Sequence, residues 1–433
     1  MKIFILALIF GTLSPVHAQD KYYGGKSTEA ILRFEGKILL APGLTATQKR
    51  EAIDVQVQHL IGHFQAPTFL AKFKFPGVLG QNYKVILARE EALAGGVSVA
   101  YRFEGKVNYH RNVFRSSNKT TVPLNLPLDP EAIYELGVVR GKNRCTDVHY
   151  NAPGDFFYFW DPDMDGCPLK GNSTDVLRLK GTLEKLENTK ATYPEYDRLY
   201  GKDTLKAAIF IGYIDNSSNR DIGAGTYRDL RASLPQLGLT LKEEKKQFRT
   251  SSNGREASGG VNNRARFEGE VVNQFGETMK LELTLLLSET ESDNSDPTFH
   301  QHLVDAYQNA DLVAYDGHSG LGGNLDLNNL PVFTFNRNYQ IFFFNGCSSY
   351  PYFNVNYFNS KPGGSRNLEI ITAGLPTLTS TSESNMLAFL TPFLSGHLTS
   401  WQNIMNRIEA SNGEEDTYLM GVNGDEDNQF LPR

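Results

Sequence analysis

The sequence predicts an α/β protein: a mainly parallel sheet flanked by helices in the C-terminal half, after an N-terminal domain of α+β or mostly β type. Short apolar runs bounded by glycine, typical of strands buried on both faces, alternate with helical segments in the C-terminal half. The N-terminal half instead shows apolar and polar residues in near-strict alternation, which is typical of strands with one buried face. The length of 433 residues allows two or three domains.

The first eighteen residues have the pattern of a signal peptide. Met1 and Lys2 precede an apolar run over residues 3–13, and the segment closes on a small residue at Ala18. We expect cleavage after Ala18 and export of the protein, either to a periplasm or as a secreted protein. No later apolar stretch approaches the length of a membrane span, so none is expected.

The following region predicts one helix and one hairpin. Apolar residues recur at helical spacing over residues 45–64, and Thr45 with Gln48 can form a capping box at the start of that helix. Residues 97–109 alternate between apolar and polar, with residues 83–88 as the expected antiparallel partner.

A polar segment over residues 187–203 is the expected linker between an N-terminal domain, residues 19–195, and a C-terminal domain, residues 196–433. The C-terminal domain alternates predicted strands with predicted helices, which indicates crossover connections and a parallel sheet. The strands are expected at 205–213, 311–315, 339–344 and 368–373, and the helices near 226–237, 298–309, 384–394 and 400–410.

Two of these strands end on reactive residues. The strand over 311–315 runs into Asp316-Gly317-His318, and the strand over 339–344 runs into Asn345-Gly346-Cys347. Function gathers at the carboxyl ends of strands in open parallel sheets, so His318 and Cys347 are expected at one edge. A thiol beside an imidazole is a nucleophile with its proton-transfer partner.

The three cysteines divide into a pair and a single residue. Cys145 and Cys167 lie in one loop-rich segment, and we expect them to form a disulfide in an oxidising compartment. Cys347 is then the free thiol. It is either a reactive cysteine or an inert buried one, since free cysteine is often fully buried.

The C-terminal half, from about residue 205 to residue 425, resembles the caspase-like (clan CD) cysteine peptidases, the group of caspases, legumains, gingipains and clostripains. The resemblance is carried by the order of the first strand, the strand into Gly317-His318 and the strand into Gly346-Cys347. The closing residues 422–425 are similar to the Gly-Asp near the end of gingipain-type domains. This resemblance implies a caspase-like fold and a bacterial-type exported cysteine endopeptidase that needs no cofactor and acts on a peptide or protein substrate.

The resemblance also implies residue roles. Cys347 would attack the scissile carbonyl, and His318 would promote the thiolate and protonate the leaving amine. The oxyanion would be held by the N–H of Cys347, which follows Gly346, and by main-chain N–H groups near Ser319 and Gly320. The family usually has glycine where Ser319 stands, and often alanine where Gly346 stands.

A specificity pocket is expected along residues 377–383, after the strand that follows the nucleophile. Glu383 in this segment would favour a basic residue of the substrate.

Two other functions fit the same residues. The C-terminal half can be a catalytically inactive caspase-like scaffold that binds a partner, since a fold does not determine a function. Asp316 with His318 can also begin a metal site, which would make the protein a metallohydrolase, although a third ligand is not evident in the sequence.

An acidic run resembles the start of a calcium-binding loop. Asp161, Asp163 and Asp165 stand at alternate positions before Gly166, but Asn172 takes the place of the last glutamate. The run therefore predicts either a calcium site or an acidic loop held by the neighbouring Cys167.

The composition argues against several partners. The net charge of −6 and the lack of a long basic run argue against nucleic acid and anionic membrane surfaces. The sequence contains no Gly-rich phosphate loop and no serine nucleophile elbow. It does not predict an oligomeric state.

Overall fold

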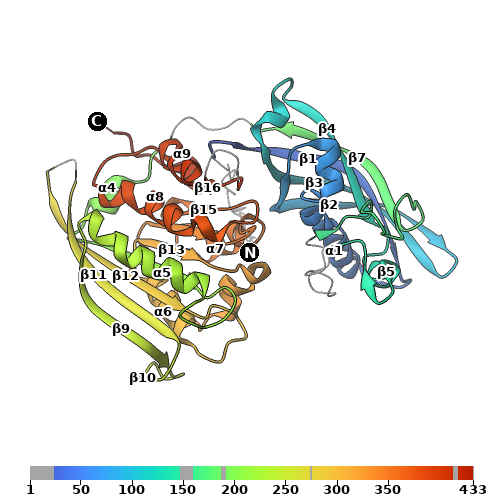
Figure 1. Cartoon of the computed structure of the whole chain (residues 1–433). Coiled ribbons are helices and arrows are strands. Elements are labelled where there is room, and N and C mark those ends of the chain that lie inside the picture. Colours follow the sequence, from blue (N-terminus) through green and yellow to red (C-terminus); the bar gives the residue numbers. More distant parts are fainter. Residues whose placement is uncertain (1–23, 147–158, 187–191, 274–275, 413–417, 433) are drawn as a thin grey trace, which may run out of the picture.

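The computed structural model describes residues 24–146, 159–186, 192–273, 276–412 and 418–432, which form two units side by side (Figure 1). Within these residues the smaller unit contains a five-stranded sheet and the larger unit a nine-stranded sheet. The expected signal peptide lies outside the described residues. Among the helices that are described, none combines the length and the apolar character needed to cross a membrane.

The smaller unit is an antiparallel sheet with one long helix packed on it. The strand order is β2-β3-β1-β7-β4. The predicted helix is confirmed as α1, and both hydrogen bonds of the Thr45–Gln48 capping box are present. The predicted hairpin is β2 with β3. The bounds are β1 Ser27–Leu40, α1 Ala46–His63, α2 Pro67–Phe73, β2 Gly77–Leu93, β3 Gly96–His110, β4 Lys119–Pro127, α3 Ile133–Leu136, β5 Val138–Val139, β6 Lys142–Asn143 and β7 Val176–Lys185.

The larger unit is built on a mixed sheet of order β10-β9-β11-β12-β8-β13-β14-β15-β16. Its middle strands, from β12 to β15, are parallel, while β10, β9, β11 and β16 are antiparallel additions at the two edges. The strand bounds are β8 Thr204–Gly212, β9 Thr240–Thr250, β10 Glu256–Ser258, β11 Asn262–Val272, β12 Thr278–Ser288, β13 Leu312–Asp316, β14 Gln340–Asn345, β15 Leu368–Thr372 and β16 Gly421–Asn423.

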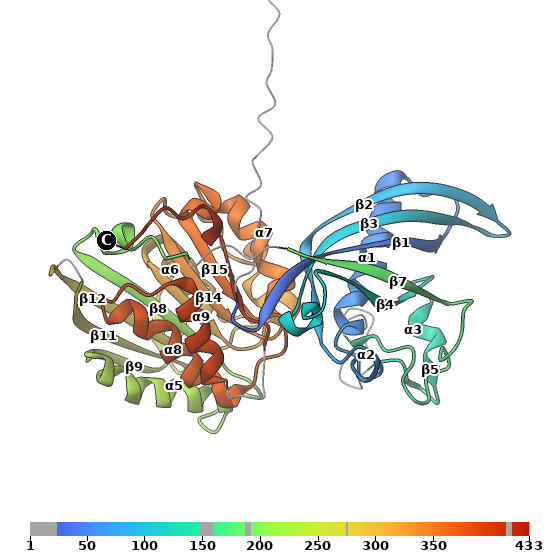
Figure 2. The same cartoon turned by 90° about the horizontal axis from the view of Figure 1, so that it is seen from above.

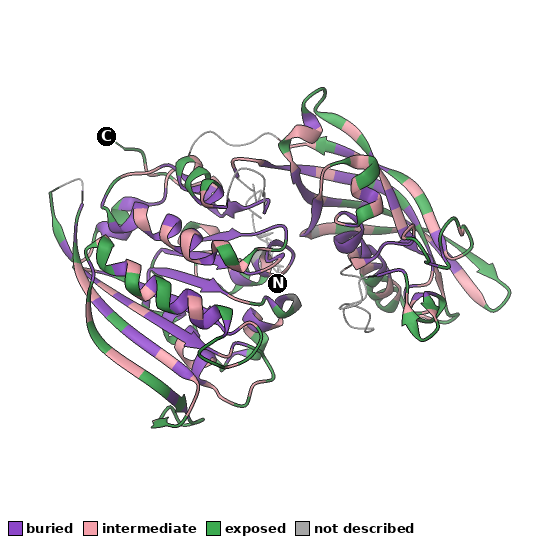
Figure 3. Cartoon of the chain, viewed as in Figure 1, coloured by how far each residue is buried: buried purple, intermediate pink, exposed green. Residues whose placement is uncertain are grey.

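Helices cover both faces of this sheet (Figure 2). One face packs against α5, α8 and α9, and the other against α6 and α7, each through its own apolar cluster. The middle strands are therefore buried on both sides (Figure 3), as their continuous apolar runs predict. The helix bounds are α5 Ile222–Ser233, α6 Thr298–Asn309, α7 Tyr350–Ser360, α8 Ser382–Leu394 and α9 Trp401–Ser411.

Part of the expected linker belongs to the larger unit. Residues 187–191 lie outside the described residues, but the short helix α4, Tyr196–Tyr200, is buried in the larger core. Tyr200 donates a hydrogen bond to the carbonyl of Phe393 at 2.8 Å. Apolar side chains on α4 explain this packing, which the surrounding charged residues obscure in the sequence.

The two units touch through β2 and α7 and through the segment that leads into β16. The Tyr350 hydroxyl donates to Glu29 at 2.9 Å. The Asn108 side chain donates to the Leu419 carbonyl at 3.0 Å, and Ser27 donates to the Met420 carbonyl at 3.1 Å. These contacts join strands β1 and β3 of the smaller unit to the larger one.

Candidate active site

Two turns meet at the carboxyl edge of the larger sheet. Strands β13 and β14 are parallel neighbours with Asp316 opposite Asn345, and His318 and Cys347 each follow two residues later. A Cβ placed on Gly346 would lie 3.2 Å from the Gly317 carbonyl oxygen, so the two turns are in contact. The turns that carry His318 and Cys347 are therefore adjacent in space.

The His318 ring is exposed, and one of its nitrogens is already bonded. Its Nε2 lies 2.9 Å from the carbonyl oxygen of Ile214. A carbonyl can only accept, so Nε2 carries a proton, and in the neutral ring Nδ1 is the free acceptor. The carbonyl of His318 accepts from Tyr315 at 2.5 Å and from Asn324 at 2.9 Å, which fixes its main chain.

The loop that presents the Ile214 carbonyl is held by one carboxylate. Asp221 accepts the main-chain N–H groups of Ile214, Asp215 and Asn216 at 2.7–3.2 Å. It also caps α5 by accepting the N–H of Gly223 at 2.7 Å. Burial alone would raise the pKa of Asp221, but these N–H groups hold it below its usual value. The sequence prediction began this helix near 226 and missed Asp221, although an aspartate before a helix is a known capping signal.

Cys347 is half-buried in a turn between β14 and α7. Its Sγ lies 3.7 Å from the carbonyl oxygen of Thr377 and 3.9 Å from that residue's hydroxyl. No hydrogen bond joins this sulfur to His318 in the described part of the chain. The next residue, Ser348, has φ +49°, a left-handed conformation that costs a non-glycine residue on the order of 1–3 kcal/mol.

The N–H groups expected to bind an oxyanion lie in an anion-binding type of turn. Ser319 has right-handed angles, φ −75° and ψ −20°, and Gly320 follows with φ +56°. Successive right- and left-handed residues turn their N–H groups toward one point and form a concavity that accepts anions. Among the described residues, no carbonyl accepts the N–H of Ser319 or that of Cys347.

A buried polar network lies behind the two turns. Asn345 donates to Asp316 at 2.7 Å, and Asn385 on α8 donates to Asn345 at 3.4 Å. Burial raises the pKa of Asp316 to about 6, against the hydrogen bonds from Ser382 and Asn345 that lower it. Asp316 thus points into the protein, and no three His, Cys, Asp or Glu side chains of the described residues gather as a metal site.

The segment expected to form the specificity pocket, residues 377–383, contacts Cys347 through its first residue: Thr377 lies beside the Cys347 sulfur, as described above. Glu383 lies in the first turn of α8, where its carboxylate accepts from Ser233 of α5 at 2.6 Å. The role of Glu383 in selecting a basic residue therefore stays a prediction.

The three aspartates of the acidic run, Asp161, Asp163 and Asp165, form hydrogen bonds or ion pairs with nearby residues. Asp161 accepts the N–H of Thr68 at 3.2 Å, and Asp165 pairs with Lys170 at 2.5 Å. Asp163 pairs with Lys72 at 3.0 Å and Arg178 at 2.8 Å; these cations lower its pKa to about 2, although burial opposes the shift. Calcium binding stays a prediction.

The expected disulfide between Cys145 and Cys167 is present beside this run.

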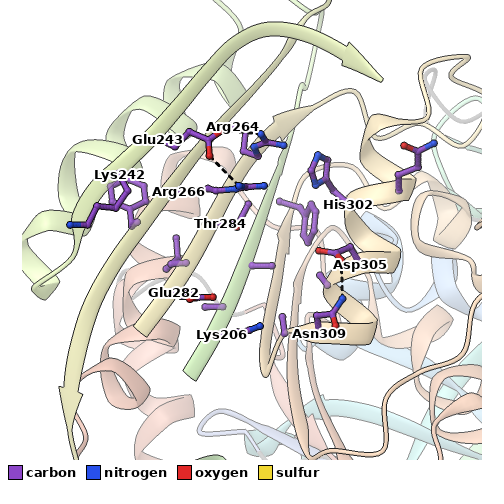
Figure 4. A pocket seen from close by; sticks show the side chains of 18 of the residues that line it. Lys206, Lys242, Glu243, Arg264, Arg266, Glu282, Thr284, His302, Asp305 and Asn309 are labelled. Atoms are coloured by element: carbon purple, nitrogen blue, oxygen red, sulfur yellow. Dashed lines mark hydrogen bonds and ion pairs between the residues drawn. The ribbon is translucent and has the colours of Figure 1, made fainter. Parts of the chain in front are cut away.

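One cavity lined by described residues lies away from His318 and Cys347. It measures about 750 Å³ and opens on the sheet face beside α6 (Figure 4). Two of its arginines are paired with carboxylates of the same cavity: Arg264 with Glu256 at 2.5 Å and Arg266 with Glu243 at 3.1 Å. Such cross-strand pairs are typical of a sheet face that is open to water.

Comparison with known proteins assigns no family. No family model, no curated protein and no solved structure matches the chain. The geometry of the two strand ends is thus the basis for a functional conclusion.

Proposed function

We propose that the protein is a cysteine endopeptidase with Cys347 as nucleophile and His318 as its proton-transfer partner. One observation carries the proposal: the two residues follow adjacent parallel strands at the same register, on turns that touch. Neighbouring strands lie about 4.8 Å apart, so residues at matching positions beyond their ends lie close along the sheet edge. A nucleophile and base within reach, with the base oriented by a third group, are the parts that covalent catalysis needs.

The reaction follows from the bonded state of the histidine. Nδ1 takes the thiol proton, and the sulfur attacks the scissile carbonyl carbon. The negative oxygen is received by the N–H groups of Ser319 and Cys347. Nδ1 then returns the proton to the leaving amine, and a thioester remains. Water, deprotonated by Nδ1, hydrolyses the thioester and restores the thiol.

The Ile214 carbonyl has a positioning role in this scheme. It keeps the other ring proton on Nε2 and stabilises the imidazolium that forms when Nδ1 is protonated. This is the part that a carboxylate plays in serine and cysteine triads.

The first experiment is cleavage of a fluorescence-quenched decapeptide library by the purified protein. We expect turnover by wild type and a loss of at least about a thousandfold in Cys347→Ala and in His318→Ala, because each removes a reacting group. His397→Ala is the matched control, since His397 is another exposed histidine on the larger unit, and its activity should equal wild type. Turnover that persists in Cys347→Ala would contradict the proposal.

A non-catalytic scaffold is the second candidate, and one observation favours it. The Cys347 sulfur contacts Thr377, with no bond to His318 within the described residues. Iodoacetamide separates the two candidates. A peptidase should be alkylated at Cys347 at a rate that depends on His318, whereas a scaffold should react at one rate in wild type and in His318→Ala.

We also propose that the protein works after export, in an oxidising compartment. The buried disulfide of Cys145 and Cys167 supports this, because such bonds persist outside the reducing cytosol. The measurement is the N-terminal sequence of the protein recovered from a periplasmic or extracellular fraction, which should begin after Ala18. Recovery of the protein with Met1 from the cytosol alone would contradict it.

A further inference from the structure

Two adjacent cavities lie between the two units. They measure about 310 and 380 Å³ and share Gln81, Tyr352 and Asn356 among their lining residues. The first is also lined by Gly320, two residues after His318, and the second by Ile61 and Tyr83 of the smaller unit. We call these two adjacent cavities together the interdomain groove.

The groove is nearly free of charge. Among the described residues that line it, Asp326 is the one that is charged at neutral pH, and its carboxylate caps a short turn by accepting the N–H of Asn328 at 2.9 Å. The other lining groups are apolar side chains, tyrosines, glycine main chain and side-chain amides. The Tyr352 hydroxyl is buried and has no hydrogen-bond partner among the described residues. A ligand with main-chain amides and few charges suits these surroundings.

The smaller unit contributes a sheet edge to the groove. Strand β2 is an edge strand, and its register with β3 breaks between Leu79 and Tyr83. Main-chain groups at such a break lack partners in the neighbouring strand. Main-chain groups at a strand edge can bond an extended peptide, as they do in many peptide-binding domains. Helix α7 lies against this edge, where the Gln81 side chain accepts the N–H of Val355 at 3.2 Å.

We propose that the interdomain groove binds the substrate on the leaving-group side of the scissile bond, as an extended and largely uncharged peptide segment. The proposal rests on the peptidase function above. His318 protonates the leaving amine, so the chain that carries this amine departs past His318, and Gly320 marks the entry to the groove on that side. The smaller unit is then half of the substrate site.

The test compares substrates that do and do not enter the groove. Quenched decapeptides extend beyond the scissile bond, whereas acyl-aminoacyl coumarin amides end there. Asn356→Trp adds a bulky ring at an exposed lining position of α7, and Asn359→Trp is the matched control, because Asn359 is exposed on the same helix but does not line the groove. Thermal unfolding checks that both variants fold.

We expect Asn356→Trp to lower kcat/KM for the decapeptides by about tenfold or more, mainly through KM, and to leave the coumarin amides within about twofold of wild type. Asn359→Trp should change neither. An equal loss on both substrate types, or no loss on either, would overturn the proposal.

Failure of the peptidase function gives a separate result. If wild type cleaves neither substrate type, retention of the decapeptides by immobilised Cys347→Ala protein tests the groove without catalysis. The groove proposal is supported if the double variant Cys347→Ala/Asn356→Trp no longer retains the decapeptides while Cys347→Ala/Asn359→Trp still does. The groove proposal is overturned if Cys347→Ala retains no decapeptide, or if neither tryptophan substitution changes the retention.

Discussion

At the scale of single residues, the turn after β13 explains why serine is accepted beside the histidine. Ser319 has ordinary right-handed angles, and the positive φ is at Gly320. Glycine is needed only where φ is positive. In this chain that position is the second residue after the histidine, whereas the caspase-like peptidases usually have glycine directly after it. The N–H of Ser319 is available all the same. The strain is instead at Ser348, directly after Cys347, where strained conformations often mark a site of function.

Asp316 makes stability depend on pH. Its pKa rises from 3.8 to about 6 on folding because of burial, so the charged form is disfavoured in the folded state. The associated stabilisation is complete below pH 3.8, declines as the pH rises and is lost above about 6. Asp316→Asn should therefore raise the free energy of unfolding by about 1–3 kcal/mol at pH 8 and leave it nearly unchanged near pH 4.

Urea unfolding at the two pH values measures this difference. Asp215→Asn, at an exposed position in the neighbouring loop, is the control and should have little effect at either pH. An equal change at pH 4 and pH 8 in Asp316→Asn would show that lost hydrogen bonds, not the buried charge, dominate.

At the scale of elements, α5 does more than cover the sheet. Its capping residue Asp221 holds both the helix start and the loop that presents the Ile214 carbonyl to His318. The end of β8, the start of α5 and the turn after β13 are thereby coupled. Loops that carry function are often held in this way by a rigid scaffold.

Two substitutions at Asp221 separate the helix cap from the loop contact. Asp221→Ser keeps an oxygen that can cap Gly223 but is too short to reach the three loop N–H groups as well. We expect it to lose about 1 kcal/mol or less of stability, while Asp221→Ala loses about 1–2 kcal/mol. Peptide cleavage should fall by a similar factor, about tenfold or more, in both, because both release the loop that presents the Ile214 carbonyl to His318.

Chemical unfolding and the pH profile of kcat/KM are the measurements. A changed acidic limb of the profile in Asp221→Ser would report an altered His318, which a change in folding alone does not produce. Unchanged kcat/KM in Asp221→Ser would remove the proposed link to His318.

At the scale of the whole molecule, a chain of contacts joins the smaller unit to the nucleophile turn. Asn108 holds the Leu419 carbonyl, and the neighbouring Tyr418 carbonyl accepts the N–H of Leu375 at 3.0 Å. The carbonyl of Leu375 accepts the N–H of Ser348 at 3.2 Å. The smaller unit therefore supports the turn that carries Cys347.

Asn108→Ala should loosen this support. It leaves the buried Leu419 carbonyl without its side-chain donor, at a cost of about 1–3 kcal/mol. We expect slower alkylation of Cys347 by iodoacetamide and a lower kcat, with KM for short coumarin amides little changed. Asn118→Ala, at an exposed position of the smaller unit, is the control. If the alkylation rate and kcat of Asn108→Ala equal those of Asn118→Ala, the two units are joined without this coupling.

The strongest sequence patterns predicted the corresponding elements well. Continuous apolar runs located β13 and β14, since burial on both faces leaves no room for polar residues. The apolar pattern and the capping box located α1, and the helix predicted over residues 298–309 is α6, Thr298–Asn309. The pattern of the strand ends predicted that His318 and Cys347 follow neighbouring strands, and the pairing of β13 with β14 agrees with this.

Other parts have no clear signal in the sequence. Helix α7 is rich in Asn and aromatic residues, starts with a proline at its second position and lacks a clean apolar stripe. Gly223 and Gly225 conceal the start of α5, because glycine is a poor helix former. The Ile214 carbonyl belongs to the main chain, and no side-chain pattern can reveal it.

The shared register of β13 and β14 has a consequence for biosynthesis. A slip of one residue between these strands would shift His318 by about 3.3 Å and turn alternate side chains to the opposite face. A nascent or mispaired chain would thus lack a working nucleophile and base. Under the proposed peptidase function, completion of the sheet would itself act as the activation step and would protect the cell that makes the protein until folding is finished.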